Sequence, residues 1–185
     1  MINDILSETR SKMKSTLSVF EEDLQGIRGS RASTGLVDRL EVEAYGQTME
    51  LRQLATLSTP EAMQILIRPF DAGTVKAIEK AIQQANIGMN PNVDGQIIRL
   101  NMPPLTRDRR QELVKVLNSR VEDARIAIRN IRRGANDDLR EFEKEKMISE
   151  DDLKRGESEV QKLTDEYIGH IEELGKDKEK EILEV

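Results

Sequence analysis

The chain has 185 residues, of which 35% are charged and 3% are aromatic, and its formal net charge is −6. It contains no cysteine and one histidine, which excludes disulfide bonds, a thiolate nucleophile, cysteine-ligated zinc and a multi-histidine metal cluster. No apolar run approaches the roughly 20 residues of a membrane-spanning helix, and the N-terminus lacks the basic-then-apolar order of a signal peptide. We therefore expect a cytoplasmic protein of one or two domains, with no membrane contact and no cofactor.

The first predicted element is a helix from Met1 to about Arg28. Gly26 and Gly29, followed by Ser30, weaken the helical pattern, so the helix should end there. The apolar side chains of this helix lie mostly three and four residues apart, at Ile2, Ile5, Leu6, Met13, Leu17, Phe20, Leu24 and Ile27.

From about residue 37 to residue 102 the pattern changes to short strand-like runs around one helix. Strands are expected near Val42, over 63–70 and over 96–102, and residues 49–57 alternate apolar and polar side chains as a strand does. The helix is expected over 78–86, with Asp71 as its N-cap and Gly88 as its C-cap. Residues 90–92, Asn-Pro-Asn, predict a turn. This segment therefore predicts a small α+β domain.

Two further helices follow. Pro103 and Pro104 end the strand-like segment, and Thr106 is the expected N-cap of a helix that runs to about Lys146. Ser149, with acids in the next three positions, predicts the start of a last helix. Their apolar stripes are Leu117, Val121, Ala124, Ile128, Ile131, Ala135 and Phe142 on one helix, and Leu153, Val160, Leu163, Tyr167, Ile171, Leu174 and Ile182 on the other. The short loop between these helices makes them antiparallel neighbours.

These elements predict a two-domain α+β fold. Two antiparallel helices cannot cover their apolar stripes alone, and the first helix carries a matching stripe. We therefore expect an elongated three-helix bundle of residues 1–29 and 105–185, with an inserted α+β domain of residues 30–104. Two tethers would let the inserted domain pivot on a two-stranded hinge. The expected hinge residues are Gly29, Ser30, Arg31, Met102, Pro103 and Pro104.

The second long helix is sharply basic in an otherwise acidic chain. At about 100° per residue, five arginines form a band roughly 100° wide beside the apolar stripe. Glu122 and Asp123 are expected not to interrupt its central two turns. Because arginine grips phosphate oxygens in pairs, the band predicts a polyanion site; the alternative is charge that is solvated or paired with acids of a neighbouring helix. The band consists of Arg125, Arg129, Arg132, Arg133 and Arg140.

Catalytic and metal sites are not expected. The single His170 is interpreted as a residue on the face of a bundle helix, and the carboxylate pairs are interpreted as solvated charges. No phosphate-cradling glycine loop of the G-x-x-x-x-G-K-[ST] type occurs.

Several strings of the sequence are typical of one family. They are IRGSRAS (27–33), LRQLA (51–55), GMNPN (88–92), IRLNMPPLTRDRR (98–110), ARIAIRNIRRGAND (124–137), ISEDD (148–152) and VQKLTD (160–165). In these strings the chain resembles the bacterial ribosome recycling factor family, over essentially its full length. One departure is Gly134, where the family often has Asp.

The resemblance implies a monomeric cytoplasmic translation factor that binds the post-termination ribosome. With elongation factor G and GTP, such factors split the ribosome into subunits and release mRNA and tRNA, and they are not themselves enzymes. The long helical domain would lie against large-subunit ribosomal RNA. The RNA-binding residues, with Arg125 added from the band, would be Arg132, Arg129, Arg133, Arg110, Arg125, Arg28 and Arg31. The alternative function is a generic helical interaction module or chaperone that does not act on ribosomes.

Overall fold

The computed structural model describes residues 1–184, which divide into two compact units. The helical unit comprises Met1–Leu24 and Lys115–Glu179, and the mixed unit comprises Gln25–Val114 and the residues from Lys180 onward. The predicted combination of three long helices with a small α+β part is confirmed. The domain boundaries at 29/30 and 104/105 stay a prediction. No helix within residues 1–184 is both long and apolar enough to cross a membrane.

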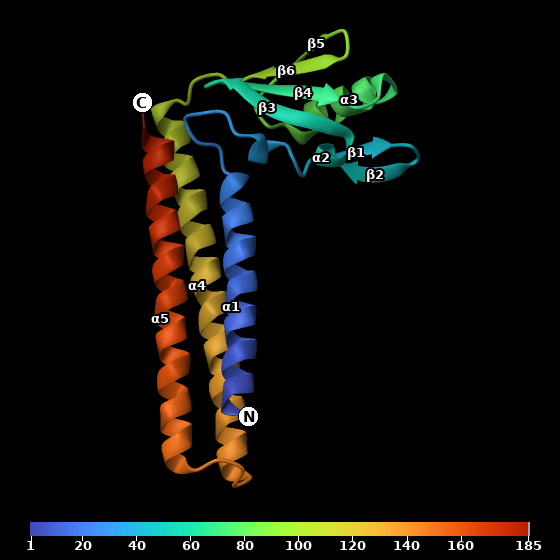
Figure 1. The fold of residues 1–185 in the computed structure, drawn as a ribbon. Coiled ribbons are helices and arrows are strands. Elements are labelled where there is room, and N and C mark those ends of the chain that lie inside the picture. The colour runs from blue at the N-terminus through green and yellow to red at the C-terminus, as the bar shows by residue number, and fades with distance from the viewer. Residues whose placement is uncertain (185) are drawn as a thin grey trace. The chain divides into compact units, whose positions relative to one another are not determined.

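Three helices make up the helical unit: α1 (Ile2–Gln25), α4 (Arg107–Lys144) and α5 (Glu150–Leu183), of which α4 and α5 continue into the mixed unit. Within the helical unit they lie side by side (Figure 1). One buried cluster takes a residue or two from each helix, namely Ile5, Ala135, Leu139 and Val160. Burial of these apolar stripes is the main source of cohesion between the helices.

The N-caps predicted for α4 and α5 are both present. The hydroxyl of Thr106 accepts the Arg109 N–H at 3.2 Å. At the start of α5, the Ser149 hydroxyl accepts the Asp152 N–H at 3.1 Å, and the Asp152 carboxylate accepts the Ser149 N–H in return at 3.4 Å. The hydrogen bond from the Ser149 hydroxyl, followed by the one from Arg155, lowers the pKa of Asp152 from its ordinary value. The side chains therefore fix where each helix begins.

The turn between α4 and α5 closes with left-handed backbone at Lys146, whose φ is 60°. The Met147 N–H donates to the Phe142 carbonyl at 2.9 Å, and the Lys146 N–H donates to the Glu143 carbonyl at 2.8 Å. This pair of bonds satisfies carbonyls at the end of α4 that have no partner within the helix. The reversal is short, as the sequence predicts.

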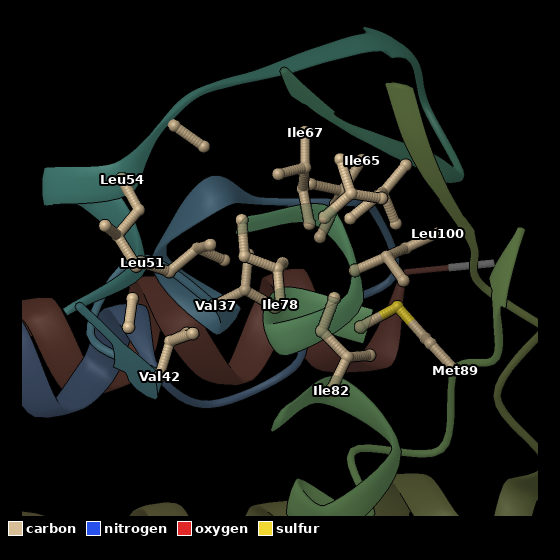
Figure 2. Packing of buried hydrophobic residues seen from close by; sticks show 14 of the residues in the cluster. Val37, Val42, Leu51, Leu54, Ile65, Ile67, Ile78, Ile82, Met89 and Leu100 are labelled. Atoms are coloured by element: carbon tan, nitrogen blue, oxygen red, sulfur yellow. The ribbon is translucent and has the colours of Figure 1, made fainter. Parts of the chain in front are cut away.

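The mixed unit contains two antiparallel sheets and the helix α3 (Val75–Ala85). One sheet is the hairpin of β1 (Glu41–Ala44) and β2 (Gln47–Glu50). The other has the order β3-β4-β6-β5, formed by β3 (Ala55–Glu61), β4 (Gln64–Pro69), β5 (Pro91–Asp94) and β6 (Ile97–Asn101). Figure 2 shows the core of the mixed unit, where Ile78 and Ile82 of α3 lie among sheet residues such as Ile65, Ile67 and Leu100.

The prediction of a strand over residues 49–57 is wrong for the residues in the middle of that range. Leu51–Leu54 forms one helical turn, α2, between β2 and β3. The Glu50 N–H donates to the Gln53 side chain at 3.0 Å and the Glu50 side chain accepts in return, which makes a capping box. Leu51 and Leu54 are three residues apart and both are buried, so the helical spacing outweighs the alternation of the surrounding residues.

Three further details of the mixed unit differ from prediction. Asp71 caps a 3-10 turn, Ala72–Thr74, that leads directly into α3, and its carboxylate accepts the Gly73 N–H at 2.9 Å. The C-cap of α3 is Asn86 in the left-handed conformation, not Gly88. The turn expected at 90–92 is also wrong, because β5 begins at Pro91 on the edge of its sheet, where proline is tolerated.

Candidate nucleic-acid interface

The arginine band of α4 lies on the side of that helix that meets α5. Three of its members reach side chains of α5: Arg125 contacts Glu172, Arg132 contacts Gln161, and Arg140 contacts Glu157. The band and the facing edge of α5 therefore form one continuous surface of the helical unit. We call the five residues Arg125, Arg129, Arg132, Arg133 and Arg140 the arginine band.

The two outer members of the band are neutralised by carboxylates. Arg125 donates to Glu172 at 2.7 Å and to Glu122 at 3.2 Å, and its side chain is 30% exposed. The bond to Glu122, with Glu172 contributing further, raises the pKa of Arg125. Arg140 donates to Glu157 at 2.9 Å through one guanidinium nitrogen and at 3.0 Å through another. For these two arginines the alternative of pairing with acids of a neighbouring helix is therefore correct.

The centre of the band is different. Arg132 donates to the side-chain oxygen of Gln161 at 3.2 Å, and Arg133 donates to that of Asn130. Both partners are neutral amides, which orient a guanidinium without cancelling its charge. Arg132 is half-buried and Arg133 is exposed. Two adjacent positive charges are thus held in place, and neither guanidinium forms an ion pair with a carboxylate of residues 1–184.

Arg129 lies between these two cases. Its guanidinium pairs with Glu122 at 3.4 Å, and the same carboxylate also accepts from Arg125. Glu122 therefore reaches Arg129, and the expectation that it does not interrupt the central two turns of the band is wrong. Glu122 is thus shared between Arg125, which also has Glu172, and Arg129, for which the 3.4 Å contact with Glu122 is a longer one than either contact of Arg125.

The predicted residues outside the band are arranged separately. Within the mixed unit, one guanidinium nitrogen of Arg110 donates to the Ser30 hydroxyl at 3.1 Å, to the Ile182 carbonyl at 2.9 Å and to the Glu184 carbonyl. Arg28 donates to the carbonyl of Pro103, and burial, with the nearby charge of Arg109, lowers its pKa. Arg31 is exposed, and no hydrogen bond or ion pair of its side chain is found among residues 1–184.

These contacts bring the two predicted hinge segments together. Arg28, which directly precedes residues 29–31, donates to Pro103 of the segment 102–104, and the Ser30 N–H donates to the Glu181 carbonyl at 3.2 Å. Met102 is buried, and its N–H donates to the Met63 carbonyl at 2.8 Å. Both segments lie inside the mixed unit. That residues 29–31 and 102–104 act as a hinge remains a prediction.

Sequence reasoning identified which arginines share a face but missed their partners. Gln161 and Asn130 leave Arg132 and Arg133 charged, and no sequence motif marks either contact. The other three arginines pair with carboxylates, namely Glu122, Glu172 and Glu157. Asn130 and Glu122 lie three positions from Arg133 and Arg125, a spacing that places side chains together on a helix. That signal was present in the sequence, whereas the contact with Gln161 depends on how α5 lies against α4.

The model of one protein family matches residues 20–183, and its description is "Ribosome recycling factor". Curated relatives carry the same name. The ribosome-recycling factors of Chloroflexus aurantiacus and Carboxydothermus hydrogenoformans are each 50% identical to this chain over 185 residues, and the alignment covers the whole of both chains in each case. That of Symbiobacterium thermophilum is 46% identical over the same length and coverage.

Solved structures agree with the sequence matches. A solution structure of a ribosome recycling factor is 44% identical, with a TM-score of 0.78 and coverage of 100% of this chain and 98% of that one. A second match, at 42% identity, a TM-score of 0.70 and full coverage of both chains, comes from models of the T. thermophilus ribosome recycling factor and E. coli elongation factor G bound to the E. coli post-termination complex.

Proposed function

The chain belongs to the ribosome recycling factor family, and we propose that it splits post-termination ribosomes into subunits together with elongation factor G and GTP. The proposal rests on 50% identity, over the full length of the chain, to a named family member. It rests also on a structural neighbour that is bound, with elongation factor G, to the post-termination complex. We propose further that the protein acts as a monomer in the cytoplasm. It would contribute binding and movement, while GTP would be hydrolysed by its partner.

We propose that the arginine band binds phosphates of large-subunit ribosomal RNA, with Arg132 and Arg133 as its centre. The observation that carries this proposal is that both guanidinium groups are oriented by neutral amides and keep their charge. Exchanging a neutral amide partner for a phosphate replaces the bond with one in which both groups are charged, and no ion pair has to be broken. Arg129, which shares Glu122, would add a third contact. Arg125 and Arg140 are expected mainly to hold α4 against α5.

The distribution of charge supports a directed contact. The chain carries a net charge of −6 although the band holds five arginines, so the residues outside the band are acidic in sum and repel phosphate. A local positive band on an acidic protein can steer one face toward RNA while the remainder disfavours other orientations. Each phosphate that the band neutralises also releases counterions, which makes such binding weaker as salt is added.

Arg28, Arg31 and Arg110 belong to the proposed RNA-binding set in different ways. Arg31 is exposed, and we propose it as a direct contact. Arg28 and Arg110 already donate to backbone carbonyls of the mixed unit, so we propose that they act chiefly by holding residues 28–31 in position. The segments 29–31 and 102–104 remain the proposed hinge on which the inserted domain moves.

Subunit splitting tests the proposed function directly. Post-termination ribosomes are mixed with this protein, elongation factor G and GTP, and the subunit fraction is followed by light scattering. We expect splitting only when all components are present, and a marked loss of splitting with Arg132→Ala. Arg10→Ala is the matched control, because it removes the same charge from a residue of α1 that pairs with Glu166 at 3.9 Å.

A generic helical interaction module or chaperone would leave the ribosomes intact in this assay. Absence of splitting with a cognate elongation factor G would therefore contradict the proposal. GTP turnover by the isolated protein would contradict the expectation that the chain is not itself an enzyme.

A further inference from the structure

A second surface of the helical unit is a groove between α1 and α4, which lie side by side there (Figure 1). It has a volume of about 380 Å³, and apolar atoms make up most of its lining. The buried Phe20 forms part of its floor, whereas Val19 is 57% exposed at its side. We call it the α1/α4 groove; it is lined by Ser15, Thr16, Val19, Phe20, Asp23, Arg120, Asp123, Ala124 and Ala127.

The α1/α4 groove and the arginine band occupy different faces of α4. At about 100° per residue, the groove-lining residues of α4 are centred roughly 180° from the centre of the band. The band contacts α5, whereas α1 supplies the other wall of the groove. Arg10 and Glu166 mark the third face, between α1 and α5. A partner in the groove would therefore leave the arginine band accessible.

The groove carries charges that are not paired within the part of the chain that the structure describes. Asp23, Asp123 and Arg120 are exposed, and no ion pair or hydrogen bond of their side chains is found within residues 1–184. By contrast, every arginine of the band has such a partner. Unpaired carboxylates at the rim of an apolar groove favour a ligand that places a cation beside an apolar group.

The same charges disfavour RNA as the occupant. Two carboxylates against one guanidinium give the rim net negative charge, which repels phosphate. The positively charged arginine band lies on the opposite side of α4 and is the better match for phosphate. Val116, four residues before Arg120, is 46% exposed and extends the apolar surface along α4. A protein segment is therefore the better fit.

We propose that the α1/α4 groove binds a segment of a ribosomal protein in which an apolar side chain is flanked by lysine or arginine. The apolar side chain occupies the groove, and the cation meets Asp23 and Asp123. The inference rests on the proposed function, because it places the occupant on the ribosome. It adds a second, protein-binding face to a factor whose other face binds RNA.

The absence of cysteine from the sequence allows a site-specific test. Ser15→Cys, which lines the groove, is labelled with a benzophenone maleimide, bound to post-termination ribosomes and irradiated. Asn118→Cys is the matched control, since this exposed residue of α4 falls on the side of the arginine band. We expect the groove label to attach to a lysine- or arginine-containing segment of a ribosomal protein, and the control label to attach to ribosomal RNA.

Charge variants test the role of the carboxylates. In the Ser15→Cys background, Asp23→Asn with Asp123→Asn is expected to lower the protein crosslink at least about tenfold, since two charge-assisted contacts are lost. Removal of two negative charges would strengthen any nonspecific attraction of the protein to RNA. A general charge effect would therefore increase binding to the ribosome and would not lower the yield of the protein crosslink. An undiminished crosslink would overturn the proposed recognition.

The other outcomes separate this inference from the proposed function. Attachment of the groove label to ribosomal RNA, or no attachment although the labelled protein cosediments with ribosomes, would overturn the groove proposal alone. Failure of the unlabelled protein to cosediment would overturn the proposed function and this inference with it.

Discussion

Replacing Arg129, Arg132 and Arg133 together by alanine is expected to weaken binding to large ribosomal subunits at least about 100-fold at moderate salt. Three charge-assisted contacts of at least about 1 kcal/mol each account for a loss of this size. The fold should persist, because the partners of these side chains are exposed amides and a shared surface carboxylate. Equilibrium cosedimentation measures the affinity, and thermal unfolding checks the fold.

A control for this variant must remove three positive charges elsewhere. Arg10, Lys14 and Arg155 are exposed cations outside the arginine band, and their joint substitution by alanine should change affinity only slightly. Equal losses in the two variants would mean that net charge, and not the band, governs binding. A triple variant of the band that binds normally would show that another surface contacts the RNA.

Arg110→Ala is expected to lower the free energy of unfolding by about 1.5–3 kcal/mol, the usual range for hydrogen bonds to a charged group. Its guanidinium donates to the Ile182 and Glu184 carbonyls at the end of α5, where carbonyls have no donor within the helix. Its positive charge also suits the negative end of the helix dipole. Urea unfolding measures the loss, and hydrogen exchange should become faster in the last turn of α5.

Arg109→Ala is the matched control for this substitution. Arg109 is 60% exposed and pairs with Glu112, one turn along the same helix, at 2.7 Å. The loss of such a surface pair should cost less than about 1 kcal/mol. If Arg110→Ala unfolded at the same urea concentration as the Arg109 variant, Arg110 would have no role in holding the end of α5.

The long helices could be predicted because several local signals agree. Apolar spacing, the hydroxyl caps of Thr106 and Ser149 and the paired prolines all point to the same boundaries. The mixed unit was less predictable because its elements are short. One helical turn at Leu51–Leu54 depends on a capping box and on backbone bonds to residues 38 and 40. The alternation of the surrounding residues does not reveal those distant bonds.

The candidate interface also has a part that the sequence predicts and a part that it does not. The helical repeat alone places the arginines on one side of α4. Whether each arginine remains charged toward solvent depends on α5, since Arg125 meets Glu172, 47 residues later, and Arg132 meets Gln161, 29 residues later. A short loop makes the helices antiparallel, but it does not specify which residues face each other. The register of α4 against α5 gives Arg125 a carboxylate partner and Arg132 a neutral amide partner, although the sequence alone does not distinguish the two arginines.

The most direct test of the RNA-binding surface is the salt dependence of binding to isolated large subunits, compared between the natural chain and Arg132→Ala. For the natural chain we predict that the logarithm of the binding constant falls linearly with the logarithm of salt concentration, by about 0.7–0.9 for each phosphate neutralised. The slope for Arg132→Ala should be shallower by about one such step. Binding that does not change with salt, or an identical slope for the two proteins, would contradict the assignment of the arginine band as the RNA-binding surface.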